Sequence, residues 1–123
     1  MIKVLYAEDD ADIRGVAEIA LEDEGFDLCF CEDGQQAVSK APEYNADLIM
    51  LDVMMPGLTG PDTLVQLRKI KGYETLPVIF MTAKVQPGEI EQYHQLGAIG
   101  VIAKPFDPME LSNDIRKLME QAA

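Results

Sequence analysis

Charged and hydroxyl side chains stand at the ends of four apolar runs in this chain. Glu8 and Asp9 follow the first run, Asp52 ends another, Thr82 ends a third, and Lys104 follows the last. If these ends meet, the three carboxylates exceed the one ammonium group by two negative charges. Crowded carboxylates are costly unless a cation neutralises them. Since carboxylate oxygens are hard ligands, the pattern predicts a site for Mg²⁺ or Mn²⁺ and not for a soft metal.

Short apolar runs must position these residues. They are mostly continuous rather than alternating and are rich in Val, Ile and Leu, which is typical of strands buried on both faces of a parallel sheet. The run with Asp27 inside it is the weakest, so we expect it to be an edge strand. The five runs cover residues 2–7, 26–31, 46–53, 76–83 and 99–103.

Helical signals separate the apolar runs. We expect Asp10 to cap the start of the first helix and Gly25 to end it. Asp33 starts a second helix, whose length Pro42 should limit. Three further prolines stand where a first helical residue is expected. They predict a third helix over 61–70, a fourth over 87–96 closed by Gly97, and a fifth that starts at Pro108.

The alternation predicts five βα units and therefore an α/β fold. Repeated βα units with short connections imply a parallel sheet with right-handed crossovers. Five strands are too few for an eight-stranded barrel, so we expect a three-layer, doubly wound sandwich. The 123 residues form one domain, 1–123. In such sheets ligands bind beyond the carboxyl ends of the strands, where the acidic residues stand.

This constellation resembles the receiver domain of bacterial two-component response regulators, in particular the single-domain, chemotaxis-regulator-like members. The resemblance covers the chain from Val4 to about Met119 and implies a flavodoxin-like fold with strand order 2-1-3-4-5. It rests on Glu8-Asp9, on Asp52 within Leu-Ile-Met-Leu-Asp-Val-Met-Met-Pro-Gly, on Thr82-Ala83, and on Lys104-Pro105-Phe106.

The resemblance implies a role for each acidic residue. Asp52 would accept a phosphoryl group from a phosphohistidine, since a carboxylate can form an acyl phosphate intermediate. Asp9 would bind Mg²⁺ (or Mn²⁺) directly, and Glu8 directly or through a water molecule. Asp52 itself and the backbone carbonyl of Met54 would complete the protein ligands.

The resemblance also implies a switch. The Thr82 hydroxyl and the Lys104 ammonium would move toward the phosphoryl group, and a cis peptide is expected between Lys104 and Pro105. The responding surface would be the fourth helix, the last strand and the fifth helix, including Gln95 and Val101. The family often has Tyr or Phe at the position of Val101, so we expect weak coupling through this residue.

Composition restricts the partners. The chain has 22 acidic and 10 basic residues, a net charge of −12, which argues against nucleic-acid and anionic-membrane binding. No apolar run approaches the roughly 18 residues of a membrane span. No signal peptide is visible, and Cys29 and Cys31 lack disulfide-framework spacing, so we expect a cytoplasmic protein. The partners that the resemblance implies are a sensor histidine kinase or histidine phosphotransfer protein and a downstream protein target. The chain would be a monomer or a weak, phosphorylation-dependent dimer.

Other functions fit the residues less well. An aspartyl phosphatase typically needs a second acid two residues after the nucleophile, where this chain has Met54. A flavin or nucleotide binder would need a Gly- or Ser/Thr-rich loop where Glu8-Asp9-Asp10 stands. A degenerate receiver used only for binding conflicts with the intact residue set. We therefore expect a signalling domain and not an enzyme beyond its own phosphorylation and dephosphorylation. A whole protein is favoured over the alternative, a receiver fragment of a longer regulator or hybrid kinase.

Overall fold

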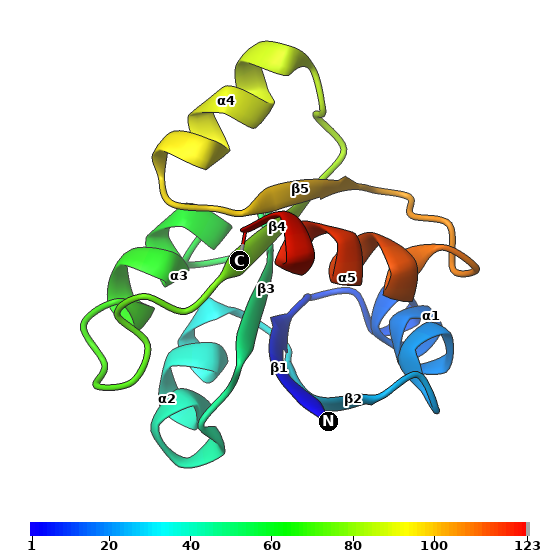
Figure 1. Ribbon diagram of the computed structural model, residues 1–123. Coiled ribbons are helices and arrows are strands. Elements are labelled where there is room, and N and C mark those ends of the chain that lie inside the picture. The colour runs from blue at the N-terminus through cyan, green and yellow to red at the C-terminus, as the bar shows by residue number, and fades with distance from the viewer. Residues whose placement is uncertain (123) are drawn as a thin grey trace.

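Strands and helices alternate along the chain in the computed structural model, which describes residues 1–122 (Figure 1). The predicted domain end at Ala123 lies outside the described residues. Within 1–122, no helix is long and apolar enough to cross a membrane. The elements are β1 (Ile2–Ala7), α1 (Ala11–Leu21), β2 (Phe26–Cys31), α2 (Gly34–Tyr44), β3 (Leu48–Asp52), α3 (Gly60–Leu67), β4 (Val78–Thr82), α4 (Pro87–Gln95), β5 (Gly100–Ala103) and α5 (Leu111–Ala122).

The five strands form one parallel sheet in the order β2-β1-β3-β4-β5, which confirms the predicted topology. β2 is an edge strand, as expected from Asp27, which is exposed. Every residue of β3 and β4 is buried, which explains their continuous apolar sequences. The strand order reverses between β1 and β3, so the carboxyl ends of these two strands are neighbours. That reversal is where open α/β sheets place their ligands.

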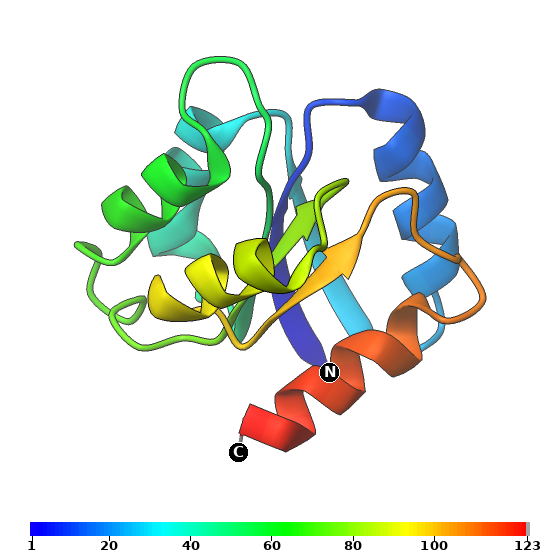
Figure 2. The same ribbon diagram turned by 90° about the horizontal axis from the view of Figure 1, so that it is seen from above.

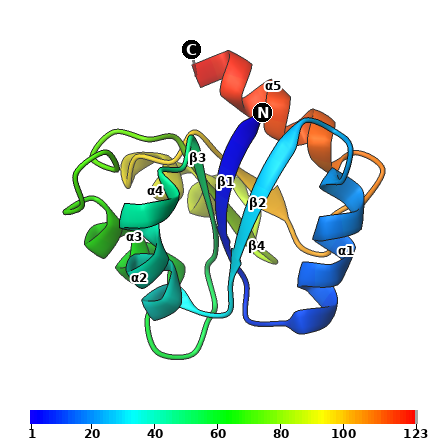
Figure 3. The same cartoon turned by 90° about the horizontal axis from the view of Figure 1, so that it is seen from below.

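Helices cover both faces of the sheet and make a three-layer sandwich. α1 and α5 lie on one face, and α2, α3 and α4 lie on the other (Figures 2 and 3). Because successive strand residues point to opposite faces, β1 divides its side chains between two cores. Leu5 and Ala7 join the core under α2 and α3, whereas Val4 and Tyr6 join the core under α1 and α5.

The ends of the first two helices differ in part from the prediction. Asp10 caps α1 as expected, since its side chain accepts hydrogen bonds from the N–H groups of Asp12 and Ile13. Gly25 does not end α1: the helix stops at Leu21, and Gly25, with φ +89°, lies in the turn before β2. Pro42 does not stop α2, which continues to Tyr44. A proline near a helix end costs a hydrogen bond, but its fixed φ is compatible with the last turn.

The third and fifth helices are shorter than predicted. α3 ends at Leu67 instead of residue 70. Pro108 is not the first residue of α5, which begins at Leu111. A tight turn precedes the helix, in which the Glu110 N–H donates to the Asp107 carbonyl at 3.0 Å. The Asp107 side chain accepts from the Met109 N–H at 2.9 Å, so it closes this turn instead of capping the helix.

The start of α3 packs directly on the backbone at the end of β3. The Gly60 N–H donates to the Val53 carbonyl at 2.9 Å. A Cβ atom at Gly60 would lie 2.7 Å from the Asp52 carbonyl oxygen and 3.0 Å from the Val53 Cα. Glycine therefore permits the close approach that fixes the position of Asp52.

Gly60→Ala should destabilise the protein by about 1–3 kcal/mol, because a backbone contact cannot be relieved by a rotamer change. Gly15→Ala is the matched control in α1, where an added Cβ meets nothing within 4 Å. That variant should be neutral or stabilising by up to about 1 kcal/mol, since alanine is the better helix former. Urea unfolding followed by circular dichroism measures both changes. Equal effects of the two substitutions would contradict the close approach at Gly60.

Candidate functional site

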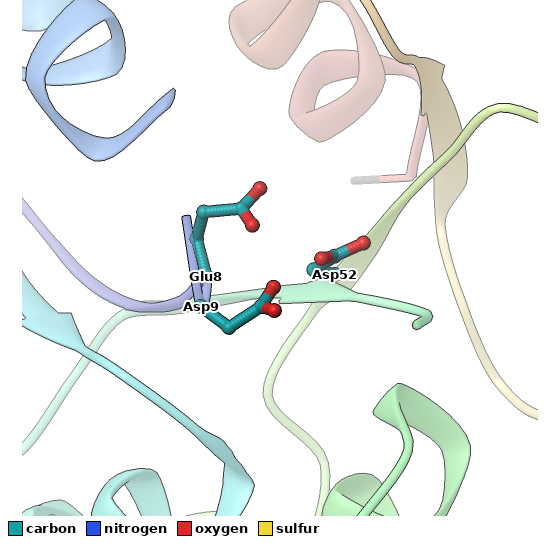
Figure 4. Close-up of side chains that lie close together, drawn as sticks. All are labelled: Glu8, Asp9 and Asp52. Carbon is teal, nitrogen blue, oxygen red and sulfur yellow. The ribbon is translucent and has the colours of Figure 1, made fainter. Parts of the chain in front are cut away.

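Three carboxylates meet at the carboxyl edge of the sheet. Glu8 and Asp9 directly follow β1, and Asp52 is the last residue of β3. One oxygen from each of the three lies within 4.8 Å of the others. Figure 4 shows Glu8 and Asp9 side by side, with Asp52 beside them on the neighbouring strand. The reversal of strand order thus joins residues that are more than 40 positions apart in the sequence.

Lys104 bridges two of these carboxylates from the end of β5. Its Nζ lies 2.9 Å from Glu8 Oε1 and 3.1 Å from Asp52 Oδ2. Glu8 is 0% exposed and Asp52 is 3% exposed, so both charges are removed from water. The Lys104 N–H donates to the Thr82 carbonyl at 2.9 Å, and the peptide bond from Lys104 to Pro105 is cis. The ammonium is therefore held between two buried anions.

Burial and charge shift the acid–base behaviour of this cluster. Burial raises the pKa of Glu8 to about 7, and the negative charge of Asp52 adds to the rise, while the Lys104 hydrogen bond and the Asp10 N–H oppose it. For Lys104, burial lowers the pKa, but the hydrogen bonds to Glu8 and Asp52 outweigh it, so its pKa lies above the ordinary value. One ammonium does not fully compensate two buried carboxylates.

Thr82 and Met54 border the same site. The site forms a pocket of about 220 Å³ lined by Glu8, Asp9, Asp10, Ile13, Asp52, Met54, Thr82, Ala83 and Lys104. Thr82 is buried, and its Oγ1 accepts from the Lys84 N–H at 3.0 Å, so its hydroxyl proton can be donated to a ligand. The Met54 N–H lies 3.4 Å from Asp52 Oδ1, while the Met54 side chain is 76% exposed. Met54 therefore contacts Asp52 through its backbone, while its side chain is largely exposed to solvent.

The residues present fit a hard divalent cation. Carboxylate oxygens from Glu8, Asp9 and Asp52 are close enough to share one ion. With Lys104 included, the cluster keeps an excess of two negative charges. Oxygen donors and this charge suit Mg²⁺-like ions.

Two residues next to the site were not identified by the sequence analysis. Arg14 in α1 donates from Nη1 to the Glu8 carbonyl at 2.7 Å and so holds the loop after β1. Tyr6 lies two residues before Glu8 and is fully buried. Strand alternation could have indicated Tyr6, because residues two apart share a face. Nothing in the sequence marks Arg14, since its partner is a backbone carbonyl that only the fold brings near.

The predicted switch residues lie on adjoining elements away from the acidic cluster. Val101 is half-buried in β5, opposite Phe80 of β4, and Gln95 is exposed in the last turn of α4. α4 lies beside β5 (Figure 1). α4 contains no fully buried residue. A helix with so little buried surface can shift at small cost.

Comparisons with known proteins agree with this geometry. Residues 4–116 match the response regulator receiver domain family. The chain is 36% identical over 117 residues to the probable transcriptional regulator ycf29 of Pyropia yezoensis, covering 95% of this chain and 53% of that protein. It is 36% identical over 121 residues to the transcriptional regulatory protein ResD of Bacillus subtilis (strain 168), covering 98% and 49%. The chain spans about half the length of these curated relatives.

A solved structure extends the likeness to three dimensions. The chemotaxis response regulator CheY4 of Vibrio cholerae superposes with a TM-score of 0.88 at 30% identity. The match covers 96% of this chain and 98% of that one, so the similarity extends over the whole fold.

The raised pKa of Glu8 predicts a pH dependence of the metal-free protein. Its pKa is about 7 in the fold against an ordinary value of 4.5, so the folded state binds more protons between these values. The stabilisation of the folded state that results from this pKa difference is fully present below pH 4.5 and is lost as the pH rises through 7. Between these values the free energy of unfolding should fall as the pH rises, by at most about 1.4 kcal/mol per pH unit. Glu8→Gln should remove it.

Urea unfolding in EDTA at several pH values measures this dependence. Glu43→Gln, which changes an exposed carboxylate, is the control and should keep the wild-type profile. Identical profiles for wild type and Glu8→Gln would show that another group titrates here.

Proposed function

Because this chain belongs to the response regulator receiver domain family, we propose that it accepts a phosphoryl group on Asp52 from a phosphohistidine. The donor would be a sensor histidine kinase or a histidine phosphotransfer protein. The observation that supports this most strongly is the buried Asp52 carboxylate, 3.1 Å from Lys104 Nζ at the edge of an acidic pocket. A carboxylate beside a fixed cation can approach an anionic phosphoryl group with reduced repulsion.

In the proposed transfer, an Asp52 oxygen forms a bond to phosphorus while the bond from phosphorus to the donor imidazole nitrogen breaks. The imidazole keeps that electron pair and takes up a proton. Lys104 remains beside the phosphoryl oxygens, and the Thr82 hydroxyl donates to one of them. These contacts position the group and offset its charge, which is most of what a protein supplies in phosphoryl transfer.

Glu8, Asp9, Asp52 and the backbone carbonyl of Met54 would hold Mg²⁺, or Mn²⁺ in its place. The bound ion would offset negative charge on the transferring oxygens. The geometric support is the set of three carboxylates within 4.8 Å and their uncompensated charge.

Phosphorylation would act as a switch on partner binding. A group of about −2 charge attracts Lys104 and Thr82, and the movement is passed to β5 and α4. Val101 lacks the ring that many receivers have at this position, so the change would be carried mainly by the backbone and by α4. The exposed face with Gln95 would then bind a downstream protein.

The proposed partners are proteins and not nucleic acid, because these residues carry a net charge of −12. The proteins ycf29 and ResD are named as transcriptional regulators, and each is about twice as long as this chain. Within a longer chain, the same switch would control an attached output domain. An aspartyl phosphatase is disfavoured, because the residue two after Asp52 is Met54, which has no acid group.

Incubation with acetyl phosphate and Mg²⁺ should add the mass of one phosphoryl group to the protein, because the Asp52 carboxylate is the proposed nucleophile. Asp52→Asn should abolish the gain, and EDTA should suppress it. Asp27→Asn, an exposed acid in β2, is the matched control and should be phosphorylated normally. Intact-mass spectrometry gives the readout, and a gain that persists in Asp52→Asn would place the phosphoacceptor elsewhere.

Phosphorylation should also shift the backbone amide signals of α4 and β5 more than those of α2, because the switch acts through Thr82 and Lys104. Thr82→Ala should reduce these shifts, whereas Thr75→Ala, at an exposed site before β4, should not. Heteronuclear NMR before and after phosphorylation provides the comparison. The methyl signals of Val101 should move little, and a large movement would contradict the weak coupling assigned to that residue.

A further inference from the structure

The hydroxyl of Tyr6 is buried without a hydrogen-bond partner. Among residues 1–122, it is the one buried side-chain oxygen or nitrogen that pairs with nothing. The residue is 0% exposed and lies near the carboxyl end of β1. An unpaired buried hydroxyl costs stability, and phenylalanine would fill the same space without that cost. The hydroxyl therefore calls for an explanation beyond packing.

Tyr6 precedes Glu8 by two residues, at the carboxyl end of β1 where the acidic cluster begins. Its side chain belongs to the core under α1 and α5, and alternation along extended chain directs Glu8 toward the same face. Its ring packs on Phe30 with centroids 5.4 Å apart and belongs to the same core as Met50 and Met81. The pKa of Tyr6 is raised, first by burial and then by the negative charges of Glu8 and Asp52, which is consistent with a hydroxyl close to these carboxylates.

The Glu8 carboxylate is the group that would need a further hydrogen-bond donor when Asp52 is phosphorylated. Its Oε1 accepts from Lys104 at 2.9 Å, and its Oε2 accepts from the Asp10 N–H at 3.2 Å. A phosphoryl group on Asp52 competes for Lys104, and any movement of the ammonium weakens its bond to Oε1. A fully buried carboxylate that loses a charged donor needs a replacement. Arg14, the nearby guanidinium, is already bound to the Glu8 carbonyl and lies 3.9 Å from Glu32.

We propose that Tyr6 is a positioning residue, whose hydroxyl donates a hydrogen bond to the Glu8 carboxylate when Lys104 turns to the phosphoryl group on Asp52. The inference rests on the proposed phosphotransfer function. It makes the hydroxyl a reserve donor: unpaired in the unphosphorylated protein and paired in the phosphorylated one. Glu8 then keeps its orientation toward the metal ion throughout the switch.

Tyr6→Phe tests this proposal, because it removes the hydroxyl and leaves the ring. Two quantities are measured: the urea midpoint of unfolding of the unphosphorylated protein in EDTA, and the affinity for beryllofluoride with Mg²⁺, a stable mimic of the acyl phosphate. The variant should unfold at the same or a higher urea concentration. Its affinity for beryllofluoride should fall by about three- to tenfold, the effect of one hydrogen bond.

Tyr73→Phe is the matched control. Tyr73 is also buried, but its hydroxyl donates to the Ala41 carbonyl at 2.7 Å and accepts from the Ala46 N–H at 3.0 Å. Its loss should lower the urea midpoint and leave the affinity for beryllofluoride unchanged.

Three outcomes would overturn the inference. A lower urea midpoint in Tyr6→Phe would mean that the hydroxyl is already bonded in the unphosphorylated state. Unchanged beryllofluoride affinity would mean that it gains no partner in the loaded state. If wild type neither binds beryllofluoride nor takes a phosphoryl group from acetyl phosphate, the phosphotransfer function fails and the role of Tyr6 fails with it. In the first two outcomes the phosphotransfer function stands.

Discussion

The contact of Lys104 with two buried carboxylates is the interaction on which the rest of this structure depends. Glu8 and Asp52 come from neighbouring strands and would repel each other in a space closed to water. The ammonium lies within 3.1 Å of both, but it supplies one positive charge where the cluster with Asp9 carries three negative ones. Lys104 thus neutralises part of the negative charge, and the cluster keeps an excess of two negative charges. In the proposed function, a bound divalent cation would offset that excess of negative charge.

The sheet supplies the geometry that this contact requires. Parallel strands bring their carboxyl ends to one edge, and the reversal of strand order makes β1 and β3 direct neighbours there. β4 and β5 then place Thr82 and Lys104 beside Asp52. The backbone around the site is held by polar contacts of ordinary strength: Arg14 on the Glu8 carbonyl, and Gly60 on the Val53 carbonyl. The buried core therefore fixes the positions of these charges.

The proposed switch needs parts that can move, and the proposed ones lie to one side of the acidic cluster. α4 packs on the sheet without a fully buried residue, unlike α2 and α3. Val101 is half-buried in the edge strand β5, where a small side chain limits the size of any side-chain movement. Tyr6, with its unpaired hydroxyl, lies in the core on the opposite face, under α1 and α5, so the two faces of the sheet have different parts in the proposed switch. In that proposal, the face with α4 passes the conformational change to the surface, and the face with Tyr6 keeps Glu8 in position while Lys104 moves.

The amino-acid sequence by itself determined the number and type of elements and the residues of the cluster, whereas the strand order was implied by the family resemblance and is shown by the structure. Continuous apolar runs, capping residues such as Asp10, and prolines at helix starts are local signals, so their meaning does not depend on distant residues. Helix ends were predicted less well. Gly25 and Pro42 were expected to limit helices and Pro108 to begin one, but whether such a residue does so depends on how the flanking segment packs.

Only the tertiary structure decided how the cluster is balanced. The sequence gives the charges of Glu8, Asp52 and Lys104 but not that a single ammonium reaches both carboxylates, because distances across 96 residues of chain are set by strand pairing. The roles of Arg14 and Tyr6 also appear only in three dimensions, since one binds a backbone carbonyl and the other is defined by a missing partner. Burial turns these contacts into large effects, because charges and hydrogen bonds count for most where water is excluded.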